Sequence, residues 1–305
     1  SNIKKAKKYL NKNYCIGVPT ETVYGLAANA YVDLAVKRIF SLKKRPKNNP
    51  LIVHYFDIDS LKKDCFINNN FTKLYQKFSP GPITYILPLK KDSKISKYVT
   101  NNERNLAVRF PKHILFRKLL KQLNYPLAAP SANIATKVSA VKAKDVKEEF
   151  GKKIKYILDG GTCDIGIEST IVNLAGKPTI LRFGGLDVSK IQKTLGLKIN
   201  IAINSKKKIV PGQSRLHYSP GIPLRMNIIK PKNDEAFILI KKRKTKLKNY
   251  FYLSSNNNLN EAAKKLYSCL RKIKNNAYKS IAVEKISNKG IGKAINDRLK
   301  RASRY

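Results

Sequence analysis

The stretch NPLIVHY, residues 49–55, joins a proline-bounded loop to an apolar run that has the length and β-branched composition of a buried strand. Similar apolar runs recur at residues 15–18, 83–89, 106–110 and 171–174. Segments with the apolar spacing of helices stand between them, at residues 33–42 and 113–123. Strands that alternate with helices predict an α/β fold.

A second unit is predicted after a change of composition near residue 204. Residues 204–209 are polar and rich in lysine, and PG at 211–212 and SPGIP at 219–223 follow. We therefore expect a larger domain at 1–203, a linker loop at 204–223 and a small α/β domain at 224–305. Within this last domain the sequence predicts strands at 224–229, 236–240, 250–253 and 280–283 and helices at 259–273 and 291–302.

The charge of the chain is strongly positive. Its 305 residues include 63 Lys and Arg against 19 Asp and Glu, a formal charge of +44, and 42% are hydrophobic, enough for a packed core. A field of this sign attracts ATP, pyrophosphate and RNA alike. The excess is mostly lysine spread along the whole chain, together with many Asn and Ile, as AT-rich coding would produce. A functional and a compositional origin both stay open.

The cysteines and the apolar runs bear on the cellular location. Four single cysteines (Cys15, Cys65, Cys163 and Cys269) form no CxxC pair, so we expect reduced, mostly buried thiols. No apolar run reaches membrane-spanning length, and residues 1–12 lack the pattern of a secretion signal. We expect a cytoplasmic protein that has no membrane partner.

Polar groups recur at the ends of the predicted strands, where α/β folds build their sites. They stand in PTETVYGL (19–26), KKRPKNNPLIVH (43–54), AVRFP (107–111), APSAN (129–133), GIEST (166–170) and ILRFGG (180–185). Arg109 is flanked by Ala, Val and Phe, which predicts burial beside an anionic partner, either a protein carboxylate or a ligand carboxylate. Structural explanations compete: Thr20 and Thr22 could cap a turn, and His54 could be a half-buried histidine whose hydrogen bonds are satisfied.

Neither of two familiar phosphate-binding devices is present, since no segment matches GxxxxGK followed by Ser or Thr, or GxGxxG after a strand. Taken in order, however, the segments above, together with PGPIT at 80–84, resemble the threonylcarbamoyl-AMP synthase family of YrdC-like proteins. RLHYSPG (215–221) and AINDRL (294–299) resemble the linker and C-terminal domain of its long form. The resemblance implies a YrdC-like twisted mixed sheet in the catalytic domain and a smaller Rossmann-like α/β C-terminal domain.

The same resemblance implies an activity. L-threonine, bicarbonate and ATP, accompanied by Mg²⁺, would give threonylcarbamoyl-AMP and pyrophosphate, and a downstream tRNA threonylcarbamoyl transferase would use this adenylate. Such a reaction is served by positioning and charge stabilisation, so hydroxyl and cationic side chains suffice. The positive charge also admits tRNA or double-stranded RNA as partners.

The residues that match the family motifs are assigned by the resemblance as follows. The expected threonine site consists of Thr22, His54, Arg109, Ala129 and Thr170, with Arg109 binding the carboxylate. The expected ATP site consists of Lys43, Arg45, Asn49, Asn105, Ser131, Ser139, Arg182 and Tyr218. We expect His217 and Tyr218 of the linker to close over the site and exclude water.

Two other functions compete with this one. YrdC-like domains also occur in carbamoyl-transfer enzymes of hydrogenase maturation, but the chain lacks the CxxC zinc modules that accompany them. A non-enzymatic RNA-binding module would explain the charge. It would not need the recurring polar groups at the strand ends, which argue against it.

Overall fold

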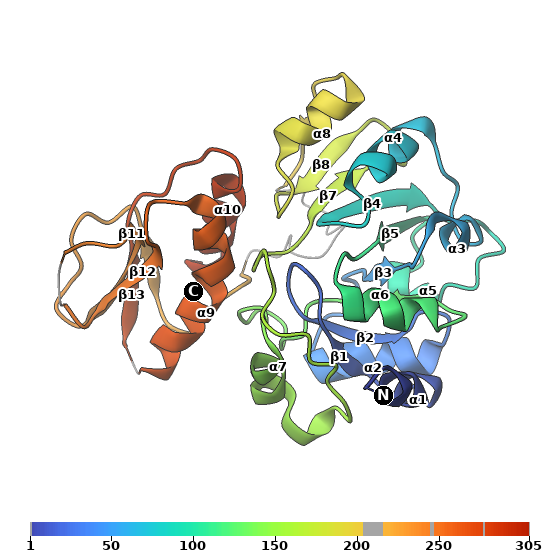
Figure 1. Cartoon of the computed structure of the whole chain (residues 1–305), viewed down its shortest axis with the longest axis horizontal. Coiled ribbons are helices and arrows are strands. Elements are labelled where there is room, and N and C mark those ends of the chain that lie inside the picture. The colour runs from blue at the N-terminus through green and yellow to red at the C-terminus, as the bar shows by residue number, and fades with distance from the viewer. Residues whose placement is uncertain (1, 204–215, 245–246, 277, 305) are drawn as a thin grey trace.

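A mixed sheet of nine strands organises the first part of the chain in the computed structural model, which describes residues 2–203, 216–244, 247–276 and 278–304 (Figure 1). The strand order is β1-β2-β6-β3-β5-β4-β7-β8-β9. Neighbours are parallel in the pairs β3/β5, β4/β7 and β8/β9 and antiparallel in the others. The strands are β1 (Ile16–Val18), β2 (Gly25–Asn29), β3 (Ile52–His54), β4 (Ile83–Pro88), β5 (Asn105–Arg109), β6 (Leu127–Ala128), β7 (Thr170–Asn173), β8 (Thr179–Arg182) and β9 (Asn200–Ile201).

The central strands alternate their side chains between two apolar clusters, as the period of two of a strand requires. Val53 and Val108 face the main core, whereas Ile52 and Ala107 face a smaller cluster on the other side of the sheet. His54 of β3 and Arg109 of β5 pair in register at the carboxyl ends of these parallel strands. The alternation places both polar residues on the face of the smaller cluster.

Helices with one apolar face cover the sheet. For example, α6 buries Phe116, Leu119 and Leu120, which lie at helical spacing. Helix α2 ends at Lys43, and the left-handed conformation of the next residue, Lys44 (φ 49°), turns the chain into the loop before β3. The helices of this part are α1 (Asn2–Asn11), α2 (Asp33–Lys43), α3 (Ile58–Lys62), α4 (Asn69–Phe78), α5 (Lys97–Thr100), α6 (Ile114–Lys121), α7 (Ala143–Phe150) and α8 (Val188–Leu195), with a 3₁₀ turn at Gly151–Lys153.

A separate parallel sheet forms the C-terminal domain, in the order β10-β13-β11-β12. Its strands are β10 (Leu224–Met226), β11 (Glu235–Lys241), β12 (Tyr250–Ser254) and β13 (Ser280–Val283). Helices α9 (Leu259–Asn275) and α10 (Gly292–Ala302) lie on the side of this sheet that faces the first domain (Figure 1). The expected Rossmann-like α/β unit is confirmed.

The predicted α/β class is confirmed as well, and every strand or helix predicted from its apolar pattern overlaps an observed element. Strands β6 and β8 correspond to the strands expected beside APSAN and ILRFGG, whereas β2 and β9 were not predicted. Residues 204–215 of the predicted linker lie outside the described residues, and the domain boundaries stay predictions. Among the described residues, no helix combines the length and the apolar character needed to cross a membrane.

Candidate active site

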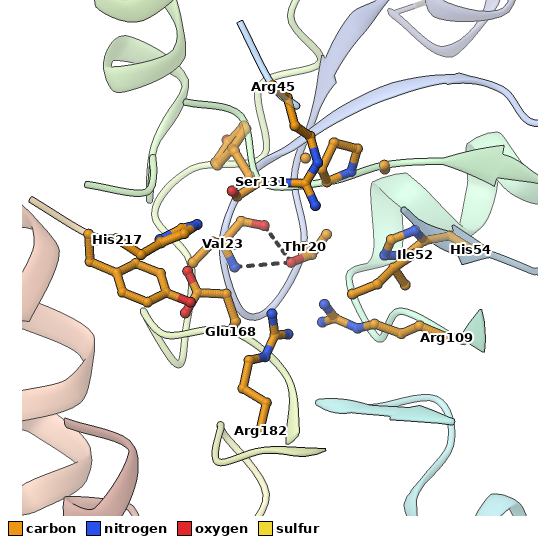
Figure 2. A pocket seen from close by; sticks show the side chains of 15 residues that line it. Thr20, Val23, Arg45, Ile52, His54, Arg109, Ser131, Glu168, Arg182 and His217 are labelled. Carbon is orange, nitrogen blue, oxygen red and sulfur yellow. Dashed lines mark hydrogen bonds between the residues drawn. The ribbon is translucent and has the colours of Figure 1, made fainter. Parts of the chain in front are cut away.

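A cavity of about 40 Å³ opens on the face of the large sheet that carries His54 and Arg109 (Figure 2). The carboxyl ends of β3 and β5, the turn after β1, the segment after β6, the loop before β7 and the end of β8 all contribute to it. The lining residues are Thr20, Val23, Tyr24, Gly25, Arg45, Ile52, His54, Arg109, Ala129, Pro130, Ser131, Glu168, Arg182, His217 and Tyr218.

The turn after β1 folds around the hydroxyl of Thr20. This oxygen donates to the carbonyl of Val23 at 2.6 Å and accepts from the backbone N–H groups of Thr22 and Val23. The hydroxyl of Thr22 lies 2.8 Å from that of Thr20 and is itself buried. Thr20 lines the cavity, whereas Thr22 supports it from behind.

Arg109 is buried and has a protein carboxylate as its partner. Its Nη2 donates to Oε1 of Glu21 at 2.8 Å, and the backbone N–H of Lys112 donates to the other oxygen of Glu21 at 3.0 Å. The Nε of Arg109 has no hydrogen-bond partner among the described residues. The arginine is thus oriented by Glu21 and retains a donor for a ligand in the cavity.

His54 is an uncharged polar group at the same end of the cavity. Burial, assisted by the charge of Arg109, lowers its pKa to about 3, so the imidazole is neutral at pH 7. Its Nδ1 is buried, and in the part of the chain that the structure describes it has no hydrogen-bond partner. An orphaned buried nitrogen beside an arginine with a free donor is the arrangement expected of a polar ligand site.

The loop between α2 and β3 supplies a second buried arginine. The Nε of Arg45 donates to the carbonyl of Asn49 at 3.1 Å, and Nη2 donates to that of Pro50 at 3.0 Å. These bonds fix the guanidinium at the cavity. Lys43 does not line the cavity; its Nζ donates to the carbonyls of Ser131 and Asn133 and so holds the segment after β6 in place.

Arg182 is the third buried arginine. Its Nε and Nη2 donate to the carbonyl of Ser169 at 3.1 and 3.0 Å. A Cβ on Gly184 would lie 2.2 Å from the carbonyl carbon of Ser169, so only glycine permits the two segments to approach this closely. In Figure 2, Arg45, Arg109 and Arg182 reach toward the cavity from three different sides.

Glu168 is the one carboxylate among the lining residues. Ser139 donates to its Oε1 at 2.7 Å, while Tyr267 and Arg298 donate to its Oε2 at 2.9 and 2.8 Å. Burial opposes the charged form, but Arg298 and Arg182 outweigh this effect and lower the pKa of Glu168 to about 2. The carboxylate is therefore charged and fully engaged at neutral pH.

His217 and Tyr218 close the remaining side. Both are buried, and their rings lie 3.9 Å apart. Tyr218 has a φ of 61°, which is unusual for a bulky residue, and the next residue, Ser219, donates its backbone N–H to Thr136 at 2.8 Å. These two residues belong to the described part of the linker and fill space that a ligand could occupy.

The structure brings together eight of the residues expected from the sequence: Arg45, His54, Arg109, Ala129, Ser131, Arg182, His217 and Tyr218. Six others do not line the cavity: Thr22, Lys43, Asn49, Asn105, Ser139 and Thr170. Asn105 is exposed at the start of β5, and the hydroxyl of Thr170 donates to the carbonyl of Leu186. Ser139 instead binds Glu168. The assigned ligand roles of all these residues stay predictions.

Several lining residues were not assigned from the sequence: Thr20, Val23, Tyr24, Gly25, Ile52, Pro130 and Glu168. Each lies within two residues of one that was assigned or in a motif already noted. The period of two in β3 could have identified Ile52, since it shares a face with His54.

The comparisons with known proteins match the chain from residue 8 to residue 304. Residues 8–184 match the Sua5/YciO/YrdC profile, described as telomere recombination, and residues 186–304 match the C-terminal domain of threonylcarbamoyl-AMP synthase. The chain belongs to the threonylcarbamoyl-AMP synthase family. The two matched regions together correspond to its two-domain form.

Relatives of this family align over almost the full chain. The threonylcarbamoyl-AMP synthases of Pyrococcus abyssi and Bacillus subtilis are each 35% identical and cover 99% of this chain, with 94% and 92% of their own lengths. The crystal structure of P. abyssi Sua5 complexed with L-threonine has a TM-score of 0.90 at 33% identity, covering 99% of this chain and 94% of that one. This full-length likeness favours the synthase over the carbamoyl-transfer and RNA-binding alternatives.

Proposed function

We propose that this chain makes threonylcarbamoyl-AMP and pyrophosphate from L-threonine, bicarbonate and ATP. The observation that carries the proposal is one cavity lined by three buried arginines and two neutral histidines, His54 and His217, in a chain of the synthase family. The amine of threonine adds to CO₂ derived from bicarbonate to give a carbamate and a proton. A carbamate oxygen then attacks the α-phosphorus of ATP, the bond to the β-phosphate breaks, and pyrophosphate leaves.

Threonine is placed at the end of the cavity formed by β3 and β5. Arg109 retains an Nε donor that can bind the threonine carboxylate, and Nδ1 of His54 can bond to its amine or hydroxyl. A neutral imidazole suits this role because it does not protonate the amine that must react. The P. abyssi structure, which is complexed with L-threonine, supports threonine as the substrate.

ATP is placed on the side of Arg45 and Arg182. Burial lowers the pKa of Arg45 to about 9, which still leaves it protonated at pH 7. Two fixed guanidinium groups in a site with little water can stabilise the charge that develops as pyrophosphate leaves. No side chain need act as a covalent nucleophile.

The size of the cavity requires a movement before ATP can bind. A volume of about 40 Å³ holds at most a few waters, whereas sites for small organic ligands occupy at least roughly 300 Å³. His217 and Tyr218 fill one side, and we propose that they withdraw to admit ATP and return to exclude water from the mixed anhydride. Tyr218→Ala would then raise the rate at which the adenylate is hydrolysed, measured by its decay in mass spectra; unchanged turnover and decay would contradict this role.

Mg²⁺ is proposed to enter with ATP. The described residues contain no group of three or more His, Cys, Asp and Glu that could hold a metal, and the oxygens of Glu168 are already engaged. The residues present therefore do not form a protein site for the ion, and phosphate oxygens and water are its expected ligands.

Partners and location follow from the product. Because the adenylate hydrolyses readily, a tRNA threonylcarbamoyl transferase must consume it, and the positive charge of the chain could bring tRNA or double-stranded RNA close. We also propose a cytoplasmic location. The four cysteines are unpaired, as expected in a reducing compartment.

The proposed reaction is tested by measuring pyrophosphate release from ATP in the presence of Mg²⁺, with threonine and bicarbonate present together, separately or not at all. Mass spectrometry would identify the adenylate. Release that requires both co-substrates is expected. Release without threonine, or none despite ATP binding, would contradict the proposal.

A further inference from the structure

Two helices of the C-terminal domain cover the loop that carries Glu168. Tyr267 of α9 and Arg298 of α10 both reach its carboxylate, at 2.9 and 2.8 Å. Tyr267 is fully buried and Arg298 is 1% exposed, so neither lies at a loose domain contact. The C-terminal domain therefore contacts Glu168, which lines the cavity, although neither Tyr267 nor Arg298 is itself a lining residue.

The same two residues also hold Tyr218. The guanidinium of Arg298 lies 4.8 Å from the centre of the Tyr218 ring, and the ring of Tyr267 stacks on it with centroids 5.8 Å apart. Arg298 further donates to the carbonyl of Phe183 at 2.8 Å. One arginine of α10 thus contacts the GIEST segment, the end of β8 and the linker together.

Backbone packing shows how closely the domains approach here. Gly166 has a φ of 78°, and a Cβ on it would lie 2.6 Å from Cα of Lys264 in α9. Any larger residue would force the helix away from the loop. The position of Glu168 relative to α9 and α10 is therefore fixed by the fold.

The negative charge of Glu168 disfavours the binding of anionic phosphates in the cavity. Several groups face it or act on its charge: Lys43, Ser139 and Arg182 from the catalytic domain, His217 and Tyr218 from the linker, and Tyr267 and Arg298 from the C-terminal domain. Arg298 forms an ion pair with it, with Nε 2.8 Å from Oε2 of Glu168. An unpaired buried carboxylate at this place would repel a triphosphate.

We propose that the C-terminal domain completes the ATP site, because Arg298 and Tyr267 hold and neutralise the Glu168 carboxylate beside the arginines that receive the phosphates. Both are positioning residues that act through Glu168. The inference rests on the proposed use of ATP. It assigns to the second domain a task within the reaction.

Arg298→Gln in the full-length protein is the principal test. The dissociation constant of a non-hydrolysable ATP analogue, measured by calorimetry, is expected to rise about tenfold or more, since the variant leaves a buried charge beside the phosphates. The KM for threonine should stay within about twofold of the wild type, since Arg109 is untouched. Adding Glu168→Gln to Arg298→Gln should restore the affinity, because the repelling charge is then gone.

Arg271→Gln is the matched control. Arg271 also crosses from α9 to the catalytic domain, where it donates to the carbonyl of Val138 at 2.6 Å and to Glu149 at 3.2 Å, and neither of these two partners lines the cavity. Its loss should leave the dissociation constant of the analogue unchanged. An equal loss of affinity in both variants would show a general effect of domain docking and overturn the proposal.

Thermal melts establish whether each variant is folded. If Arg298→Gln does not fold, Arg298→Lys and Tyr267→Phe replace it: the first keeps the charge and should bind as the wild type does, and the second loses one bond to Glu168 and should bind a few times more weakly. Equal affinities in all folded variants, or no rescue by Glu168→Gln, would overturn the inference. Analogue binding without threonine-dependent pyrophosphate release would instead count against the proposed reaction alone.

Discussion

Two buried arginine–glutamate pairs flank the cavity, and they present opposite ends to it. In the Arg109–Glu21 pair the arginine lines the cavity and the carboxylate stands behind it. In the Arg298–Glu168 pair the carboxylate lines the cavity and the arginine stands behind. Nearly identical distances of 2.8 Å therefore support different functions.

The origin of the supporting residue also differs. Glu21 belongs to the same domain as Arg109, and it is anchored by the backbone N–H of Lys112. Arg298 comes from the other domain, 130 residues along the chain from Glu168. A buried ion pair is by itself weak evidence that the pair stabilises the fold. We therefore take the residue of each pair that lines the cavity as the one that can act on a ligand.

The largest effect is expected from Arg109→Ala. The variant removes the donor proposed for the threonine carboxylate and leaves the charge of Glu21 buried without its partner. Truncating one member of such a pair costs about 2–5 kcal/mol, so kcat/KM for threonine should fall at least about 30-fold. Threonine-dependent pyrophosphate release measures this.

A direct binding measurement separates this effect from a collapse of the site. The affinity for the ATP analogue should change little in Arg109→Ala, because Arg45 and Arg182 are untouched. If the variant lost ATP binding but kept the KM for threonine, Arg109 would not bind the threonine substrate. The two ion pairs would then not differ in function as proposed.

Glu21→Gln should have a smaller effect on the same parameter. The amide can still accept a hydrogen bond from Arg109, but the charge that orients the guanidinium is lost. We expect the KM for threonine to rise roughly tenfold with kcat nearly unchanged, as for the loss of one charge-assisted bond. If the KM for ATP rose instead, Glu21 would support the binding of ATP and not that of threonine.

A further effect concerns the dependence of stability on pH. His54 beside one pair and His217 beside the other both have a pKa lowered by burial to about 3. The unfolded chain therefore binds protons first as the pH falls below about 6.5, and the stability contributed by each neutral histidine is lost between pH 6.5 and pH 3. Glu168, with a pKa lowered to about 2, adds its own loss only at pH below about 4.5.

Urea unfolding at pH 7 and pH 5 measures this change. Each buried histidine should cost about 2 kcal/mol over this interval, and His54→Gln should remove roughly half of the total. Stability that did not change between the two pH values would show that the histidines are hydrated or charged in the folded protein.

The sequence predicted the strands that are mostly apolar, such as β3 and β4, because β-branched runs of strand length are typical of buried strands. It did not predict β9, which has only two residues and carries no period of its own. It is a strand because the neighbouring strand β8 offers it a pairing partner. Short pairings of this kind depend on the tertiary fold.

By itself, the sequence determined the α/β class, the family and most residues of the cavity, because these depend on local composition and on motifs read in order. It left open whether Arg109 pairs with a protein or a ligand carboxylate, and the structure supplied Glu21. Only the tertiary structure decided that Glu168 is held by Tyr267 and Arg298. Contacts between residues so far apart in the sequence depend on how the two domains dock. Local sequence patterns do not predict them.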